Sequence, residues 1–212
     1  MADATPEQQE VLWTIGHSNH PLDDFLDLLV QHQINVLVDV RSSPYSRYAS
    51  HFNKKAIEGP LQGRAIRYLF LGDVLGGRAQ GEQFYDDQGH VLYGRLAESP
   101  QFQEGIERLL RGVATHRVAL MCGEEDPTDC HRRRLIGRVL GQRGVDVLHI
   151  RGDGRVQREA QLAAEEKFRK TKGQLTLFDV EEADEWKSTQ SVLPRSGPRS
   201  SLKSSNGPES ND

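Results

Sequence analysis

The chain alternates short apolar runs with longer segments whose apolar residues recur at helical spacing. The apolar runs cover residues 11–15, 36–40, 66–71, 118–121 and 145–150, and their length and composition are typical of buried strands. Apolar residues three and four positions apart predict helices between these runs, with the apolar positions Leu22, Phe25, Leu26 and Leu29, then Phe102, Ile106, Leu109, Leu110 and Val113, then Leu135, Ile136, Val139 and Leu140.

Two stretches have no clear period. Within residues 48–65 we expect a short helix that ends near Gly59-Pro60. Residues 79–95, which are rich in Gly, Asp and aromatic side chains, predict a long loop or hairpin over the site.

The alternation of strands and helices predicts an α/β fold with three layers: a mostly parallel sheet of about five strands with helices on both faces. We expect a flexible N-terminus (1–10), the α/β domain (11–155) and a charged helix (156–173). A short linear peptide (174–180) and a Ser-, Pro-, Gly- and Asn-rich disordered tail (181–212) follow.

Polar, reactive side chains follow several of the predicted strands. They are His17 after Gly16, Asp39 with Arg41, Asp73, Cys122 with Glu124, and Asp153. Parallel strands place their carboxyl ends at one edge of the sheet, where open α/β folds bind ligands. We therefore expect these side chains to gather at a binding site, although strand ends are often polar for structural reasons alone.

The strongest candidate chemistry lies in residues 118–134. Cys130 is predicted in the first turn of a helix, with Thr128 or Asp129 as its N-cap, and the helix dipole and the following His131 and arginines favour a thiolate. Free backbone N–H groups with Arg132 are equally suited to holding a phosphate. Arg133 and Arg134 are expected on the solvated face of this helix.

Both cysteines also have structural interpretations. Cys122 and Cys130 are each consistent with small packing residues, and the sixth position after Cys122 is Thr128, so the Cys-x5-Arg spacing of cysteine phosphatases is absent. Cys122, Cys130, His131 and His17 form a potential metal set, but their spacing is outside that of common zinc sites, so a metal is not favoured and the cofactor is left unknown.

The other candidates have two interpretations each. His17 is suited to a general base or a phosphate donor, or to a simple turn residue. Asp39 with Arg41 predicts a structural ion pair or a substrate clamp, and Glu124 a catalytic carboxylate or part of a solvated acidic turn. His32, His90, His116 and His149 are expected to be structural.

Composition limits the class of protein. The net charge of −4 argues against general electrostatic attraction to nucleic acid but leaves room for a local basic patch. Two cysteines are too few for a disulfide scaffold and favour a reducing cytoplasm. The polar N-terminus and the lack of a long apolar run predict neither a signal peptide nor a membrane span.

Several motifs together resemble one bacterial family, catalogued as "domain of unknown function 488". They are TIGHSN (14–19), DVRSSPYSR (39–47), HFN (51–53), LGDVLGGR (71–78) and MCGEEDPTDCHRRR (121–134). The resemblance covers about residues 11–155 and implies a compact α/β domain whose active residues lie in these motifs. The candidates it implies are His17, Ser18, Asp39, Arg41, Ser46, Cys122, Glu124, Cys130, His131 and Arg132.

Residues 174–178 resemble the short peptide by which bacterial proteins bind the DNA polymerase sliding clamp. Leu175, Leu177 and Phe178 would enter hydrophobic pockets, with Gln174 making polar contacts, unless these residues pack back on the domain.

The leading expectation is an enzyme that hydrolyses a phosphoester or N-glycosidic bond in a nucleotide or in DNA and is brought to replication or repair by the clamp. In this scheme Cys130 or Cys122 is the nucleophile or acid, His17 and His131 carry protons, and Arg41 and Arg132 hold a phosphate or carboxylate. The alternatives are a non-catalytic nucleic-acid or clamp adaptor and a thiol or metal redox sensor.

Overall fold

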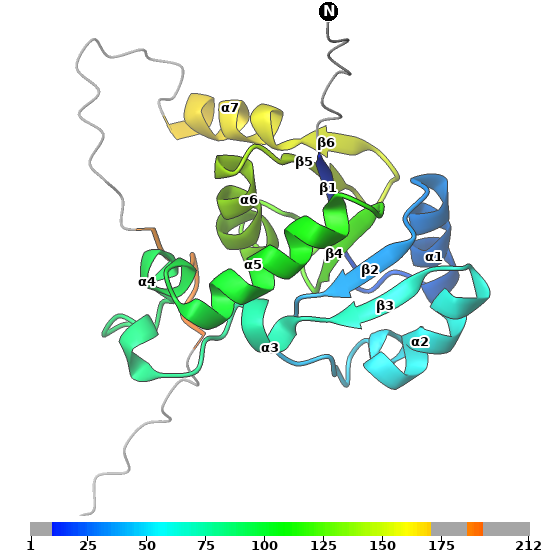
Figure 1. Ribbon diagram of the computed structural model, residues 1–212, viewed down its shortest axis with the longest axis horizontal. Helices are drawn as coiled ribbons and strands as arrows, with labels where there is room; N and C mark the ends of the chain where they lie inside the picture. The colour runs from blue at the N-terminus through cyan, green and yellow to red at the C-terminus, as the bar shows by residue number, and fades with distance from the viewer. Residues whose placement is uncertain (1–9, 171–185, 193–212) are drawn as a thin grey trace, which may run out of the picture.

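The computed structural model describes residues 10–170 and 186–192, and Figure 1 draws the remainder as a grey trace. A six-stranded sheet runs through the molecule in the order β3-β2-β4-β1-β5-β6. The strands are β1 (Val11–Gly16), β2 (Val36–Asp39), β3 (Arg67–Phe70), β4 (Val118–Cys122), β5 (Asp146–Ile150) and β6 (Val156–Arg158). Strands β1 to β5 are parallel to one another, and β6 is antiparallel to β5.

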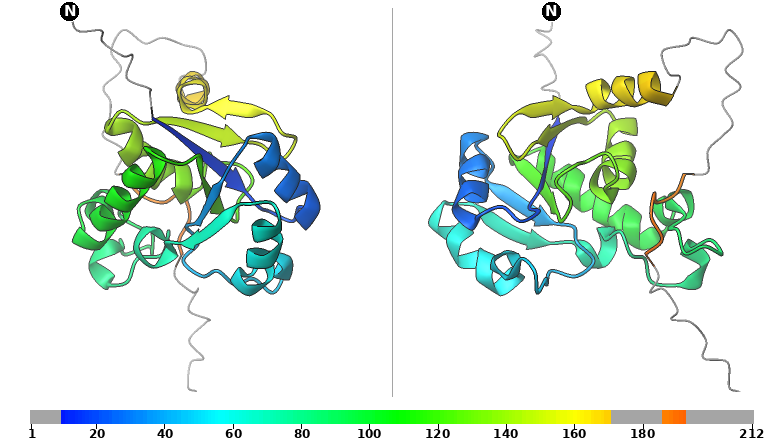
Figure 2. Two further views of the ribbon diagram at one scale, coloured as in Figure 1. Left: turned by 45° about the vertical axis from the view of Figure 1, so that its right-hand side comes forward. Right: turned by 180° about the vertical axis from the view of Figure 1, so that it is seen from behind.

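Helices cover both faces of this sheet, so the predicted three-layer α/β fold is confirmed (Figure 2). On one face α1 (Leu22–Gln31) and α2 (Lys54–Gly63) bury their apolar residues. On the other lie α3 (Gly72–Leu75), α4 (Tyr93–Ala97), α5 (Pro100–Val113), η3 (Arg132–Gly137) and α6 (Arg138–Gln142). The short 3-10 helices are η1 (Ser50–Phe52) and η2 (Glu82–Phe84).

The alternation of side chains along the strands supplies the two cores. In β4, Val118, Leu120 and Cys122 face the α5 side, whereas Ala119 and Met121 face the α1 side. Every residue of β4 is buried because the strand lies inside the sheet with a helical layer on each face.

Four expectations about the elements are corrected by the structure. Residues 156–158 form the edge strand β6, and only then does α7 (Glu159–Lys170) begin, so the charged helix does not start at Val156. The second helix runs through Pro60 to Gly63 instead of ending near Gly59-Pro60. Residues 79–95 form the expected hairpin at the antiparallel bridge between Tyr85 and Val91, but they also contain η2 and the start of α4, which were not expected.

The fourth correction concerns the expected disordered tail. Residues 186–192 lie against the domain, where Lys187 forms an isolated bridge with Leu92 and the Ser188 amide donates to the Val91 carbonyl at 2.9 Å. The Trp186 indole N–H donates to the Arg134 carbonyl at 2.8 Å. Residues 1–9 of the expected N-terminus and the remainder of the expected peptide and tail, including Gln174, Leu175, Leu177 and Phe178, lie outside the described residues.

Across 10–170 and 186–192, no helix is both long and apolar enough to cross a membrane.

Candidate functional site

The candidate site lies at the carboxyl ends of three adjacent strands, β1, β4 and β2. Gly16 is level with Cys122, and Asp39 is level with Met121. The chains stay together beyond the strands, because the His17 amide donates to the Cys122 carbonyl at 2.9 Å and the Ser18 amide donates to the Gly123 carbonyl at 2.8 Å. The sheet thus brings together segments that are more than a hundred positions apart in the sequence.

A buried ion pair occupies the end of β2. Asp39 is fully buried, and its Oδ2 accepts from Arg41 Nη2 at 2.6 Å and from the Tyr68 hydroxyl at 2.7 Å. Arg41 Nε donates to Asp39 Oδ1 at 2.9 Å, and Nη2 also donates to the Phe52 carbonyl at 2.8 Å. Burial alone would lower the pKa of Arg41, but the contact with Asp39 raises it. These contacts fix the guanidinium through Nε and Nη2 and leave the third nitrogen, Nη1, directed away from Asp39.

That nitrogen meets His17. Arg41 Nη1 lies 3.0 Å from His17 Nε2, and His17 Nδ1 lies 2.8 Å from the Ser18 carbonyl oxygen. A guanidinium only donates, so Nε2 accepts and the proton is on Nδ1. The ring stacks on Phe52 with 4.5 Å between centroids. Burial, helped by the adjacent Arg41 charge, lowers the pKa of His17 to about 4, so the imidazole is neutral at pH 7.

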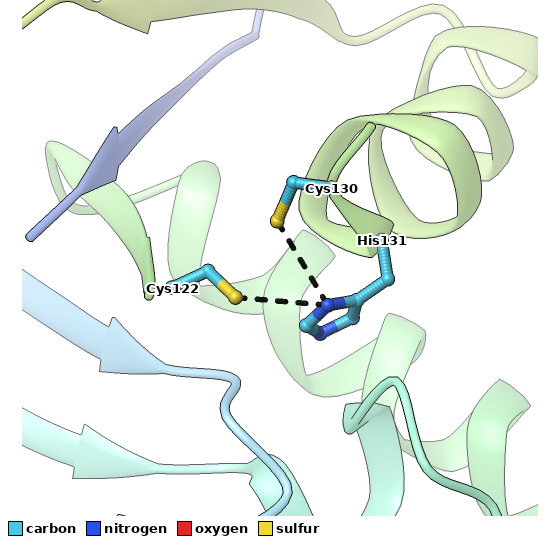
Figure 3. A group of neighbouring side chains, drawn as sticks. All are labelled: Cys122, Cys130 and His131. Carbon is cyan, nitrogen blue, oxygen red and sulfur yellow. Dashed lines mark hydrogen bonds between the residues drawn. The ribbon is translucent and has the colours of Figure 1, made fainter. Parts of the chain in front are cut away.

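Four polar side chains meet at the end of β4 and the start of η3. Glu124 Oε2 accepts from Cys122 Sγ at 2.9 Å and from Cys130 Sγ at 3.1 Å. His131 Nδ1 lies 3.7 Å from Cys122 Sγ and 3.9 Å from Cys130 Sγ (Figure 3). We call Cys122, Glu124, Cys130 and His131 the thiol cluster. Both cysteines are buried free thiols, whereas Glu124 is exposed.

The two thiols differ in acidity. Burial by itself would raise the pKa of Cys130, but the hydrogen bond with Cys122, the His131 ring and the Arg132 charge hold it well below its usual value. The hydrogen bond with Cys130 and burial raise the pKa of Cys122. Burial disfavours protonation of His131, yet its contact with Cys130 raises the pKa of the imidazole. The first thiolate to form in this pair is therefore that of Cys130.

Arg132 supports the turn beneath the thiol cluster and does not face solvent. Its side chain is fully buried and donates to the carbonyls of Glu124 and Glu125, the latter at 2.6 Å. Its Nε donates to the Thr14 hydroxyl at 3.4 Å. The expectation that Arg132 binds a phosphate is corrected, because its guanidinium is buried and directed at the carbonyls of the turn.

A glycine allows this turn to lie close to β1. A Cβ atom at Gly16 would lie 1.8 Å from the Glu124 carbonyl oxygen, so only glycine fits there. The backbone of the Glu124 turn is therefore fixed by Gly16 on one side and by Arg132 on the other.

The start of the helix after the turn also differs from expectation. The Cys130 carbonyl accepts from the Arg134 amide at 3.0 Å, and the Thr128 amide instead donates to Asp126 at 2.8 Å. Cys130 thus directly precedes the helical residues, and neither Thr128 nor Asp129 caps them. The segment that follows, η3, is π-helical, a widening often found at functional sites.

The other expected site residues have structural contacts. Ser46 Oγ accepts from the Tyr48 and Ala49 amides at 3.2 Å, and these bonds stabilise a local turn. Ser18 lies in the turn after β1 with a φ of 43°. Arg133, expected on a solvated face, is buried and pairs with Glu159 and Glu166 at 2.8 and 2.9 Å.

The sequence did not single out three groups at the site. Tyr68 binds Asp39, the Val40 carbonyl binds His131 Nε2 at 3.0 Å, and Gly77 faces the His131 ring. Tyr93, from the stretch expected to cover the site, is buried near Cys130, and burial raises the pKa of its hydroxyl. The motif LGDVLGGR (71–78), which contains Gly77, was the available sequence indication that this glycine lies at the site.

Comparisons with known proteins add the family. No curated protein and no solved structure matches the chain. The model of one family, "Domain of unknown function DUF488", matches residues 21–139, more than half of the 212 residues. This range includes both cysteines, Glu124, Asp39 and Arg41. The chain therefore belongs to the DUF488 family.

Proposed function

We propose that the protein is an enzyme that hydrolyses a phosphoester or N-glycosidic bond in a nucleotide or in DNA, with its reaction centre at the carboxyl edge of β1, β4 and β2. The observation that carries the proposal is that the thiol cluster and the His17–Arg41 pair meet at this edge. Groups with strongly shifted pKa values gather preferentially where chemistry takes place.

The two groups of residues have separate tasks in this proposal. Asp39 holds Arg41, and Arg41 Nη1 presents a donor beside His17. An anionic oxygen of the substrate is a stronger acceptor for a guanidinium than the neutral His17 imidazole, so it takes the place of His17 Nε2. The thiol cluster, one strand away in the sheet, supplies the reacting groups.

Substrate reaches the thiol cluster from the side of Glu124. Cys122 and Cys130 are 4% and 1% exposed, whereas Glu124 is the exposed member. Two surface depressions, one lined in part by Trp186 and the other in part by Tyr68, contain no member of the thiol cluster.

An activity screen over nucleotides and damaged DNA tests the proposal. The wild-type protein is compared with Cys130→Ser and His17→Ala, and with Glu107→Gln on the exposed face of α5 as a control. We expect both site variants to lose at least about 100-fold in turnover, the scale for losing a positioned proton carrier or nucleophile. An activity that Cys130→Ser retains in full would remove the thiol cluster from the reaction.

The link to DNA rests on the peptide at residues 174–178. We propose that Gln174, Leu175, Leu177 and Phe178 bind the sliding clamp, with the apolar side chains in its hydrophobic pockets. A pull-down with the clamp compares the wild type with the double variant Leu177→Ala/Phe178→Ala. Equal capture of both proteins contradicts the motif, whereas capture without any hydrolytic activity is the outcome that an adaptor predicts.

A further inference from the structure

Three donor atoms with affinity for soft metal ions converge in the thiol cluster. Cys122 Sγ, Cys130 Sγ and His131 Nδ1 all lie within 4.8 Å of one another. The two cysteines come from opposite ends of the same turn, and the imidazole points its Nδ1 between the two sulfurs (Figure 3). This is a compact set of two thiols and one imidazole, with a carboxylate beside it.

The spacing of these atoms is close to that of a tetrahedral zinc site. Bonds of about 2.3 Å to sulfur and about 2.1 Å to nitrogen place the ligand atoms of a tetrahedron about 3.6 Å apart for a sulfur–nitrogen edge. The observed sulfur–nitrogen distances are 3.7 and 3.9 Å. Both sulfur–nitrogen distances therefore need to shorten by only a few tenths of an ångström for the three side chains to bind a cation.

We propose that Cys122, Cys130 and His131 bind one Zn²⁺ ion. Thiolate and imidazole donors select zinc over magnesium or calcium, which prefer oxygen. The long spacing between the cysteines, which argued against a metal in the sequence, is bridged because the turn between them folds back onto β1. His17 is not part of the set, because its Nε2 contacts Arg41 and its Nδ1 contacts the Ser18 carbonyl.

The imidazole is already oriented for this role. His131 Nε2 lies 3.0 Å from the Val40 carbonyl oxygen, so the ring proton is on Nε2 and the lone pair of Nδ1 faces the sulfurs. Histidines that bind metals commonly donate their second N–H to a backbone carbonyl in this way. A Cβ atom at Gly77 would lie 2.9 Å from the ring, so glycine leaves the space that the ring occupies.

The fourth coordination position faces Glu124. When zinc replaces the thiol protons, the Glu124 carboxylate loses both of its hydrogen-bond donors and is repelled by the two thiolates. It is then free to turn to a water molecule on the cation. Three protein ligands with one position left for water are typical of catalytic zinc sites, and two cysteines, one histidine and a nearby glutamate base form the set that zinc deaminases use on nucleobases.

The catalytic part of this inference rests on the proposed function and specifies how the thiol cluster acts in it. Zinc lowers the pKa of the bound water, Glu124 accepts one proton, and the resulting hydroxide attacks the phosphorus or the sugar carbon of the substrate. Glu124 then returns the proton to the leaving oxygen or base nitrogen. Cys130 is a ligand in this scheme, and its replacement abolishes activity through loss of the metal.

Metal analysis of the purified full-length chain, supplied with zinc and then dialysed, is the direct test. We expect one zinc per chain in the wild type and in Thr128→Ser, a conservative change in the same turn. Cys122→Ser, Cys130→Ser and His131→Gln should each weaken binding at least about 100-fold, since even a lost outer contact weakens metal binding about 10- to 100-fold. Glu124→Gln should keep the zinc but lose hydrolysis.

Cobalt substitution of the wild-type protein keeps the test decisive if a ligand variant fails to fold. Tetrahedral thiolate-bound Co²⁺ gives intense visible bands and a near-ultraviolet sulfur charge-transfer band. A weak octahedral spectrum, or wild-type protein without bound zinc, overturns the metal site whatever the activity. Full hydrolysis by metal-free protein overturns the catalytic role of zinc, and absence of hydrolysis by zinc-loaded protein counts against the proposed function while the metal site stands.

Discussion

The buried, neutral His17 predicts that the protein loses stability in mild acid. Its pKa lies near 4 in the folded protein instead of the ordinary 6.5, chiefly because burial disfavours the imidazolium. The unfolded chain therefore binds a proton at a higher pH than the folded chain does. Stability is complete above pH 6.5, falls as the pH drops, and levels off below pH 4 for this group.

The magnitude follows from these two pKa values. The full difference between pKa values of 6.5 and about 4 corresponds to a loss of about 3 kcal/mol in the free energy of unfolding. At pH 5 about 2 kcal/mol of this stability has been lost relative to neutral pH. Other groups also titrate in this range, so the contribution of His17 has to be isolated by a variant. His17→Gln keeps an acceptor for Arg41 but cannot be protonated.

Urea unfolding at pH 7.5 and at pH 5 measures this difference. We expect the wild type to lose about 2 kcal/mol more than His17→Gln between the two conditions. An NMR titration of the His17 ring should show its midpoint near pH 4. The same loss in both proteins, or a midpoint near 6.5, would refute the burial argument.

Three further predictions concern the framework of the site. Gly16→Ala places a Cβ atom 1.8 Å from the Glu124 carbonyl oxygen and should lower the free energy of unfolding by about 2 kcal/mol or more. Gly59→Ala, whose Cβ atom would have nothing within 4 Å, should be neutral or stabilising by up to about 1 kcal/mol. Urea unfolding compares the two variants, and equal effects would contradict the close approach at Gly16. Arg133→Met removes the guanidinium that pairs with Glu159 and Glu166, and it should increase the hydrogen exchange of the α7 amides while those of β1 stay protected. Unchanged protection of α7 would show that these ion pairs do not hold the helix on the domain. Trp186→Ala removes the indole donor to the Arg134 carbonyl and should raise the hydrogen exchange of the Ser188 amide. Retained protection would mean that the backbone contacts of residues 187–192 and the ion pair between Lys187 and Asp86 hold the segment without the indole.

The candidate site could be predicted where local sequence and strand order carry the information. Strand ends that carry Gly-His, Asp-Val-Arg and Cys-Gly-Glu indicated which residues would meet, because parallel strands place their ends together. The direction of each side chain was not predictable. Arg132 and Arg133 are adjacent and equally charged, yet one binds carbonyls of the turn and the other binds carboxylates of α7.

Two segments could not be predicted from the sequence, because distant partners determine their structure. β6 has three residues, and its extended form depends on pairing with β5 through Leu148, His149 and Ile150. Trp186 lies in a polar stretch whose composition predicts disorder, and contacts with residues far away in the sequence, the Arg134 carbonyl, the Gly94 amide and the Arg138 guanidinium, hold it on the domain. Short segments take their structure from their partners more than from their own composition.

The sequence by itself determined the α/β class, the alternation of strands and helices, and the gathering of polar residues at one edge of the sheet. Periodicity and residue type are local properties, and parallel strand order converts them into a shared edge. Only the tertiary structure decided that Cys122, Cys130 and His131 face one another. The Nδ1 atom points at the sulfurs because the carbonyl of Val40, 91 positions earlier, holds the other nitrogen of the ring, a contact that no local pattern encodes.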